Sequence, residues 1–317
     1  MNTRCPHCHS ENLKVHQKNG HALSITYRCL ACNHFFSERR LTGYSGLKLP
    51  PEKILRIVNC LCEGVSVRAT ARLVDVTKNT VLRVMRHVAG LCQHVMDDRL
   101  RNLNLKYIQA DEMHTFTKKK EARVRDDERR FKSPHVGDTW LWIATDGETK
   151  LVPCFYVGNR DLVAAQRFMH DLADRLASRC QLTSDGLRAY QWAVESAFGS
   201  DVDYGMLVKY YSAVDGEIRL TGARPKAITG YPDPRHISTS YAERNNLNCR
   251  TFLRRLTRLT IAFSKKLENL VAMLWIYFAH YNFVRIHGSL RITPAMAANV
   301  TDHVWTMEEL LNAGVSS

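Results

Sequence analysis

The sequence predicts an α/β protein with a mixed β-sheet flanked by helices, preceded by two small amino-terminal domains. Two observations lead to this fold class. Paired cysteines and three short helical patterns fill the first hundred residues. From Lys106 onward, apolar strand patterns and amphipathic helices follow in the order β-β-β-α-β-α. We therefore expect a cysteine-rich domain over residues 1–42, a small helical domain with a connecting helix over 50–104, and a large α/β domain over 105–317.

The composition is that of a globular protein with a basic surplus. The chain has 317 residues, 45% of them hydrophobic, and a net charge of +14 with a pI near 9.4. Such a surplus favours a polyanionic partner, although nucleic acid, an anionic membrane surface or simple solubility could each explain it. The longest apolar run, 270–279, is far shorter than the roughly 20 residues that span a bilayer. With no secretory pattern at the start, we expect a cytoplasmic protein.

Two C-x-x-C pairs predict a metal site in the first domain. Cys5 and Cys8 are separated from Cys29 and Cys32 by 20 intervening residues, and each pair places two thiolates on one tight turn. Two such turns complete a tetrahedral Zn²⁺ site, which would be structural because so short a segment buries too little core to fold alone. Unpaired core cysteines are the alternative. The remaining cysteines lack ligand spacing and are expected to be buried thiols: Cys60, Cys62, Cys92, Cys154, Cys180 and Cys249.

A helix-turn-helix domain is predicted after a linker over 43–51. Helical patterns cover 51–62, 66–73 and 77–89, and Ser66 and Thr77 are expected to cap the second and third helices. The third helix has an apolar stripe that can dock it, and an opposite polar face that can enter a major groove. A small helical bundle with a solvated basic face is the alternative. A charged connecting helix should follow over 91–105. The polar face consists of Asn79, Arg83 and Arg86.

Two acids end strands in the large domain. A short strand over 107–110 ends on Asp111, and another over 180–184 ends on Asp185. If these strands are neighbours, the carboxylates converge and can bind Mg²⁺, as a metal-dependent phosphoryl-transfer site requires. Taken singly, Asp146 or Asp161 would qualify equally well. Between the two strands we expect a hairpin (140–145 and 152–157) and a helix (162–178), and after the second strand a helix over 190–198.

A third acid is expected on the segment that begins at Tyr241. If this segment is helical through Leu259, Glu243 shares one face with Arg250 and Arg254, while the opposite face is apolar. A carboxylate aligned with arginines suits a helix that crosses a metal site beside phosphates. The alternative is a surface glutamate with ordinary helical partners.

These motifs resemble a known family. Gln109-Ala-Asp-Glu-Met-His, Leu182-Thr-Ser-Asp-Gly and Glu243-Arg-Asn-Asn-Leu are similar to the acidic motifs of DDE transposases, closest to the insertion-sequence-one family. The run from Tyr281 to Leu290 resembles a carboxy-terminal tail that many DDE transposases and integrases share. The order of zinc-binding region, helix-turn-helix and catalytic domain also fits, so the resemblance covers nearly the whole chain.

The resemblance implies an RNase H-like fold in which Asp111, Asp185 and Glu243 bind Mg²⁺ or Mn²⁺. It implies a nucleoid-associated enzyme that cleaves transposon ends, binds terminal inverted repeats, joins the ends to target DNA, and acts as a homodimer or larger assembly. Fifty-seven residues separate Asp185 from Glu243, longer than the family's usual interval, which predicts an inserted loop or hairpin near 204–234. Glu112 is a second choice as ligand because it should point to the other face of its strand.

Two further segments have alternative interpretations. Residues 118–132 are rich in charge and could contact DNA or simply be solvated. The aromatic helix over 275–283 is expected in the core, with a base-stacking platform as the alternative. For the whole chain, the competing functions are a non-catalytic DNA-binding regulator and a metal-dependent nuclease that does not join strands.

Overall fold

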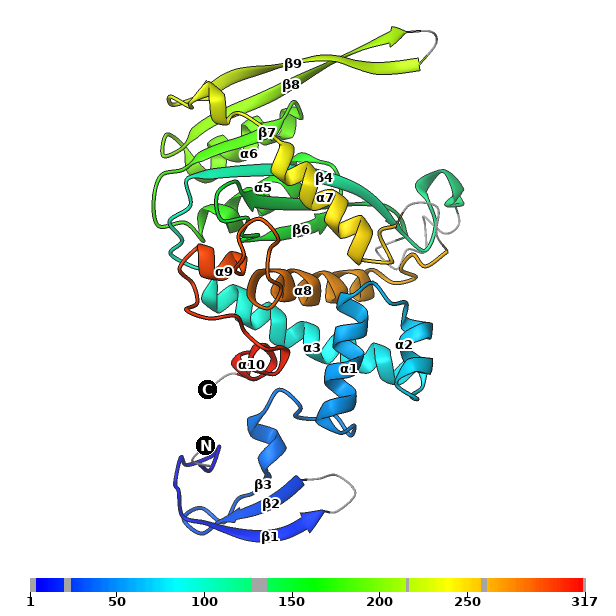
Figure 1. Ribbon diagram of the computed structural model, residues 1–317, viewed down its shortest axis with the longest axis vertical. Coiled ribbons are helices and arrows are strands. Elements are labelled where there is room, and N and C mark those ends of the chain that lie inside the picture. The colour runs from blue at the N-terminus through cyan, green and yellow to red at the C-terminus, as the bar shows by residue number, and fades with distance from the viewer. Residues whose placement is uncertain (1–3, 20–23, 127–135, 215–216, 258–260, 316–317) are drawn as a thin grey trace.

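The computed structural model describes residues 4–19, 24–126, 136–214, 217–257 and 261–315. A small sheet near the amino terminus is followed by a layer of helices and then by a large sheet with helices on both faces (Figure 1). The small sheet contains β1 (Leu13–Asn19), β2 (Ser24–Cys29) and β3 (Phe35–Ser37), with the 3-10 helix η1 (Glu38–Leu41) after it. The helical layer contains α1 (Pro51–Cys62), α2 (Val67–Leu73), α3 (Lys78–Arg99), α8 (Leu267–Phe283), α9 (Pro294–Ala297) and α10 (Met307–Ala313).

The large sheet is mixed and has six strands in the order β6-β5-β4-β7-β8-β9. β7 pairs in parallel with both β4 and β8, and the other neighbours are antiparallel. The predicted α/β class with a mixed, helix-flanked sheet is therefore confirmed. The strands are β4 (Tyr107–Thr117), β5 (Gly137–Asp146), β6 (Phe155–Gly158), β7 (Gln181–Asp185), β8 (Asp203–Val214) and β9 (Glu217–Thr229).

Helices cover both faces of this sheet. On one face lie α5 (Leu162–Ala173) and α6 (Arg188–Phe198), and on the other lies α7 (Ser240–Phe252) (Figure 1). Side chains of β4 alternate between these faces, so that Gln109 contacts α7 while Glu112 contacts Tyr190 of α6. The short 3-10 helices η2 (Glu121–Arg123) and η3 (Pro234–His236) complete the described elements. No helix within the described ranges is both long and apolar enough to cross a membrane.

The predicted helices of the second domain are present, with one correction. The Ser66 and Thr77 side chains accept hydrogen bonds from the backbone N–H groups of Ala69 and Thr80, as expected for N-caps. However, α3 does not stop near residue 89 before a separate connecting helix, because it runs unbroken to Arg99. A glycine inside a helix costs about 1 kcal/mol, and burial of the stripe on both sides of Gly90 offsets that cost. The buried stripe comprises Val81, Val84, Met85, Val88, Cys92, Val95 and Met96.

Several boundaries in the large domain also differ from the prediction. The helix expected through residue 178 ends at Ala173, and the segment from Tyr241 is helical only to Phe252, with residues 258–260 outside the described part. The expected insertion near 204–234 is the β8–β9 hairpin, and its first strand is an integral member of the sheet. Residues 127–132 of the predicted basic loop lie outside the described ranges. The aromatic segment 275–283 belongs to α8 and is almost entirely buried, as predicted.

The helical layer and the large sheet share one hydrophobic core. α8 lies against α3 on one side and packs Trp275 and Phe278 on Phe155 of β6 on the other. The buried Arg175, just after α5, ties the same two units together. Its guanidinium binds Asp97 and Asp171 at 2.6 and 2.9 Å and donates to the Met96 carbonyl at 2.9 Å. The predicted second and third domains are thus joined by a continuous interior.

The Arg175 contacts lead to a stability prediction. We expect Arg175→Met to lower the free energy of unfolding by about 2 kcal/mol, because it removes the charge-assisted hydrogen bonds to the Met96 carbonyl and to two partly exposed carboxylates. The matched control is Arg167→Met. The Arg167 side chain is exposed on α5 and has a single described hydrogen bond, to the Tyr156 hydroxyl. Its replacement should therefore change stability little. Urea unfolding followed by circular dichroism measures both, and equal effects would contradict a linking role for Arg175.

Candidate functional site

The register of β4 and β7 brings two of the predicted acids together. Ala110 pairs with Ser184 in the parallel ladder, and the next residue on each strand is Asp111 and Asp185. β7 ends at Asp185, as predicted, but β4 does not end on Asp111, because it continues to Thr117 along β5. Within the described part of the chain no strand lies beside this edge of β4 beyond Asp111, and side chains from both faces of β4 border the opening.

Glu112 joins the two aspartates in one acidic cluster. Asp111, Glu112 and Asp185 each have a carboxylate oxygen within 4.8 Å of the other two. The Glu112 side chain does lie on the α6 face, where Arg160 binds it at 2.7 Å and the Tyr190 hydroxyl donates to it at 3.1 Å. It still approaches the aspartates, so the residue that the sequence ranked second is part of the cluster. Three oxygen donors so close together suit a hard divalent cation such as Mg²⁺ or Mn²⁺.

The electrostatics of the cluster favour added positive charge. Burial, together with the charges of Glu112 and Asp185, raises the pKa of Asp111 from 3.8 to about 7. Burial and the Asp185 charge likewise raise the pKa of Glu112, although Arg160 and Tyr190 act in the opposite direction. A cation held between the carboxylates would relieve this repulsion, and the donor set therefore fits a metal ion.

Polar contacts in the first two turns of helix α7 fix it against β4. The Gln109 side-chain oxygen accepts hydrogen bonds from the backbone N–H groups of Tyr241 and Ala242 at 2.8 and 3.2 Å, and so caps the helix. One turn later, the Asn246 amide donates to Asp111 at 2.7 Å. Neither residue was singled out from the sequence. Asn246 follows Glu243 by three positions and therefore lies on the same side of α7.

Glu243 is not one of the three members of the cluster, although it lies one turn before Asn246, which contacts Asp111. Its carboxylate accepts hydrogen bonds from Lys209 of β8 and from the Thr239 hydroxyl, the latter at 2.9 Å. Burial opposes ionisation of Glu243, but these two hydrogen bonds outweigh it and lower its pKa. The Lys209 charge also acts on Asp111, where it lowers the pKa. Lys209 thus links Glu243 electrostatically to the acidic cluster, a role that the sequence did not indicate.

The two arginines predicted to share the Glu243 face are separated in the structure. Arg250 is on α7, and its guanidinium contacts the Met113 sulfur at 3.1 Å. Arg254 lies in a turn after the helix and is exposed. Because α7 ends at Phe252, Arg254 does not continue the stripe that helical periodicity predicted.

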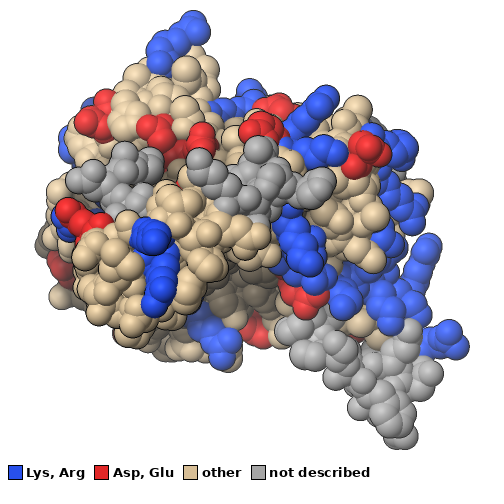
Figure 2. Space-filling model, turned by 90° about the horizontal axis from the view of Figure 1, so that it is seen from below, with Lys and Arg blue, Asp and Glu red and all other residues tan. Residues whose placement is uncertain are grey.

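The predicted DNA-reading face of α3 is exposed at its amino-terminal end. Asn79 and Arg83 are exposed, but Arg86 donates to Asn269 at 3.0 Å and pairs with Glu268 at 3.2 Å, so α8 holds it. Figure 2 shows Lys and Arg gathered along the right-hand side of the molecule, the side on which Figure 1 places α2 and the start of α3. The exposed basic residues of α2 and of the first two turns of α3 are Arg68, Arg72, Lys78 and Arg83.

The four predicted cysteine ligands form a second cluster, near the amino terminus. Their sulfur atoms lie within 4.8 Å of one another, with Cys5 to Cys32 at 3.6 Å and Cys8 to Cys29 at 3.5 Å. Four sulfurs placed tetrahedrally at about 2.3 Å from a zinc ion would be about 3.8 Å apart, so the arrangement fits Zn²⁺. The other six cysteines are free, and five of them are buried.

The backbone of both cysteine turns supports metal binding. His9 and Asn33, each one residue after a pair, have φ of 57° and 59°, and the Cys5 and Cys29 N–H groups donate to Ser10 and His34 carbonyls at 2.9 Å. Burial acts to raise the pKa of the Cys29 thiol, but the N–H groups of Cys32 and Ala31 outweigh it and lower the pKa to about 6. A thiolate, the form that binds zinc, is thereby favoured.

Comparisons with known proteins do not assign the chain to a family. No protein-family model matches it, and a search of curated proteins gives no match.

The cysteine cluster predicts one bound zinc ion per chain. We expect Cys29→Ser to lose the zinc and to expose the first 42 residues to proteolysis, because the small core around Cys5, Cys29 and Phe36 is separate from the main core. Metal analysis and limited proteolysis measure the two effects. Cys60→Ser, which removes a thiol outside the cluster, is the control, and retention of zinc by Cys29→Ser would refute the assignment.

The acidic cluster predicts an unusual pH dependence when divalent metal is withheld. Because the pKa of Asp111 rises from 3.8 to about 7 on folding, the native state keeps a proton that the unfolded state releases between these values. Stability should therefore fall as the pH rises from about 4 to about 7. We expect Asp111→Asn to stabilise the metal-free protein at pH 8 by about 1–2 kcal/mol, and to reduce this pH dependence to the part that the raised pKa of Glu112 contributes.

Thermal unfolding without added divalent metal tests this expectation. Asp201→Asn is the control, since the Asp201 side chain is 82% exposed and its loss should have little effect at any pH. A lower melting temperature for Asp111→Asn at pH 8 would show that the carboxylate does not strain the fold.

Proposed function

We propose that the chain is a DDE-type DNA transposase, an enzyme that cleaves the ends of a transposable element and joins them to target DNA. The observation that carries the proposal is the acidic cluster of Asp111, Glu112 and Asp185 at adjacent parallel strands. Helix α7, which contacts Asp111 through Asn246, carries Glu243 one turn earlier. The strand order supports an RNase H-like assignment. Three antiparallel strands, β4 to β6, are followed by β7 and β8, which pair in parallel and are reached through α5 and α6.

Asp111 and Asp185 would hold Mg²⁺ or Mn²⁺, with Glu112 as a further oxygen donor and Glu243 as the third acid of the proposed site. The bound metal would supply Lewis-acid activation of the attacking oxygen and neutralise charge on the phosphate. The protein's own part is to fix these groups. Asn246 holds Asp111 at 2.7 Å, and Arg160 and Tyr190 hold Glu112.

The proposed reaction consists of two in-line displacements at phosphorus. Water first attacks a phosphodiester at the transposon end, which forms one P–O bond, breaks another and releases a 3′ hydroxyl. That hydroxyl then attacks a target phosphodiester, again exchanging one P–O bond for another, so the joining step needs no outside energy source. Lys209 of β8 contacts Glu243 in the first turn of α7, and Arg250 lies in the last turn of that helix. Both would stabilise the negative charge of the strands being exchanged.

The other parts of the chain would bind and pair the DNA ends. Asn79 and Arg83 are exposed at the start of α3, where they could contact base edges in a major groove at a terminal inverted repeat. The cysteine cluster would hold a structural zinc ion that orders residues 1–42. Pairing of two transposon ends requires two catalytic chains, and we therefore propose a homodimer or larger assembly on DNA.

Strand transfer in vitro tests the proposal. With Mg²⁺ or Mn²⁺ and DNA carrying the element's own ends, we expect joined products from the wild type and a loss of at least about a hundredfold in Asp185→Asn, a typical order for a group that stabilises developing charge. End binding by the variant should remain. The matched control is Asp161→Asn, because Asp161 caps α5 and asparagine caps helices equally well.

Other outcomes would replace the proposal with one of its rivals. Cleavage without joining would identify a nuclease. Sequence-specific binding with no cleavage by the wild type would identify a regulator. Loss of joining in Asp161→Asn as well as in Asp185→Asn would show that the assay responds to folding and not to the acidic cluster.

A further inference from the structure

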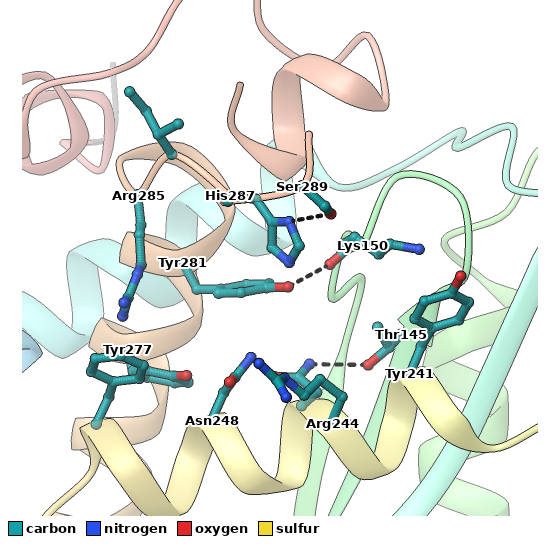
Figure 3. A pocket seen from close by; sticks show the side chains of 14 residues that line it. Thr145, Lys150, Tyr241, Arg244, Asn248, Tyr277, Tyr281, Arg285, His287 and Ser289 are labelled. Carbon is teal, nitrogen blue, oxygen red and sulfur yellow. Dashed lines mark hydrogen bonds between the residues drawn. The ribbon is translucent and has the colours of Figure 1, made fainter. Parts of the chain in front are cut away.

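A second site lies on the side of α7 that faces away from the acidic cluster. It is a cleft of about 590 Å³ between α7, the turn after β5 and the segment that follows α8. Read at about 100° per residue, Tyr241, Arg244 and Asn248 lie on the cleft side of α7, opposite Glu243 and Asn246. Figure 3 shows Tyr241, Arg244 and Asn248 of α7 at the cleft. Since Asn246 of the same helix contacts Asp111, one helix borders both sites.

The cleft is lined by basic side chains and by no acidic one among the described residues. Lys150, Arg244 and Arg285 contribute three positive charges, drawn from three separate segments of the chain. Neither arginine has a carboxylate partner within the described ranges, although Arg285 stacks on the Phe252 ring at 3.6 Å. Burial, and then the charges of Lys150, Arg285 and Arg244, lower the pKa of His287. An electropositive, sheltered cleft of this kind favours an anion.

Aromatic rings form the rest of the wall. Tyr281 donates its hydroxyl to the Lys150 carbonyl at 3.1 Å, and the Lys150 ammonium lies 3.3 Å from the centre of the Tyr241 ring (Figure 3). Tyr241 is 44% exposed and can contact a ligand. The Lys150 ammonium also donates to the Gly147 carbonyl, but no carboxylate of the described residues pairs with it. Aromatic rings beside cations without a carboxylate partner are the combination that holds a base together with its phosphate.

The Asn245 side chain is a third feature of the cleft that bears on the kind of ligand it binds. Its amide donates to Thr145 at 3.0 Å, but its side-chain oxygen is buried and has no hydrogen-bond partner in the described part of the chain. Buried acceptors are normally paired. An ionised phosphate has no N–H to offer this oxygen, whereas a nucleobase has. The volume also exceeds what a phosphate alone needs, and it falls in the range of about 300–1,000 Å³ that is typical of small-molecule sites.

We propose that this cleft binds one unpaired nucleotide of a DNA strand, with its phosphate at Arg244 and Arg285 and its base against Tyr241. The binding chemistry is that of any nucleotide; its assignment to a DNA strand rests on the proposed function. In that role the cleft would hold an unpaired end while the same helix presents Glu243 and Asn246 to the acidic cluster.

Fluorescence anisotropy without added divalent metal tests the proposal, since nothing is cleaved under these conditions. Two probes share one duplex, which is blunt in the first and carries a four-nucleotide single-stranded overhang in the second. We expect the wild type to bind the overhang probe about tenfold more tightly, within the range for one stacked base. The Arg244→Gln and Arg285→Gln variants should lose this preference and bind the blunt duplex as the wild type does.

Controls separate the cleft from general charge and from misfolding. Arg99→Gln removes one positive charge from a residue 51% exposed at the end of α3, and should keep the preference. Melting curves of all variants identify any that fail to fold; because Arg285 packs on Phe252, Arg244→Gln decides the question if Arg285→Gln unfolds. Equal weakening of both probes, or an unchanged preference in Arg244→Gln, would overturn the proposal.

A competition arm distinguishes the two sources of the ligand. Millimolar deoxyadenosine monophosphate that abolishes the overhang preference would show that the cleft also takes free nucleotides. Persistence of the preference would restrict the cleft to a strand. Because no arm depends on cleavage or joining, loss of the overhang preference and failure of strand transfer are read separately.

Discussion

The parallel pairing of β4 with β7 is the constraint on which the rest of the site depends. It sets Ala110 beside Ser184, so the strands deliver Asp111 and Asp185 to the same opening. A shift of one residue in this register would turn one aspartate to the opposite face of the sheet and separate the pair. The early end of β7 matters equally, because it leaves room for Glu112 to approach from the other face. Clustering these acids costs free energy, as the raised pKa of Asp111 indicates, and the surrounding core must supply it.

Helix α7 transmits that geometry to the remaining groups. Gln109, two residues before Asp111, caps the helix, and Asn246 returns from the helix to Asp111, so strand and helix hold each other in register. The Glu243 side chain of α7 is then fixed by its hydrogen bond with Lys209 of β8. On its other side the helix borders the basic cleft. A single element therefore positions both the acidic cluster and the proposed nucleotide site, and a change in its tilt would alter the two together.

The sequence predicted best what depends on neighbouring residues. The cysteine turns, the Ser66 and Thr77 caps and the buried stripe of α3 follow from local spacing. The sequence also marked the acids, but it placed Asp111 at the end of a strand, whereas β4 continues through Asp111 to Thr117. Whether Asp111, Asp146 or Asp161 mattered depended on which strands pair across some 70 residues, which alternation cannot reveal. Asp146 proves to hold a turn and Asp161 a helix cap. Helical periodicity misplaced two helix ends, because α3 continues past Gly90 and α7 stops before Arg254. Lys209 had no sequence pattern to mark it, and Asn246, although it stands in the Glu243-Arg-Asn-Asn-Leu run, had no predicted role.

The central claim is that the β4–β7 opening binds a divalent cation through its carboxylates, and a Mn²⁺ titration followed by electron paramagnetic resonance tests it most directly. Zinc-loaded wild-type protein should bind Mn²⁺ saturably, and Asp111→Asn and Asp185→Asn should each weaken the binding at least about tenfold, since each removes one of the three clustered ligands. Asp161→Asn should bind as the wild type does. Equal Mn²⁺ affinity in all four proteins would contradict the account, because the acids would then be grouped without forming a metal site.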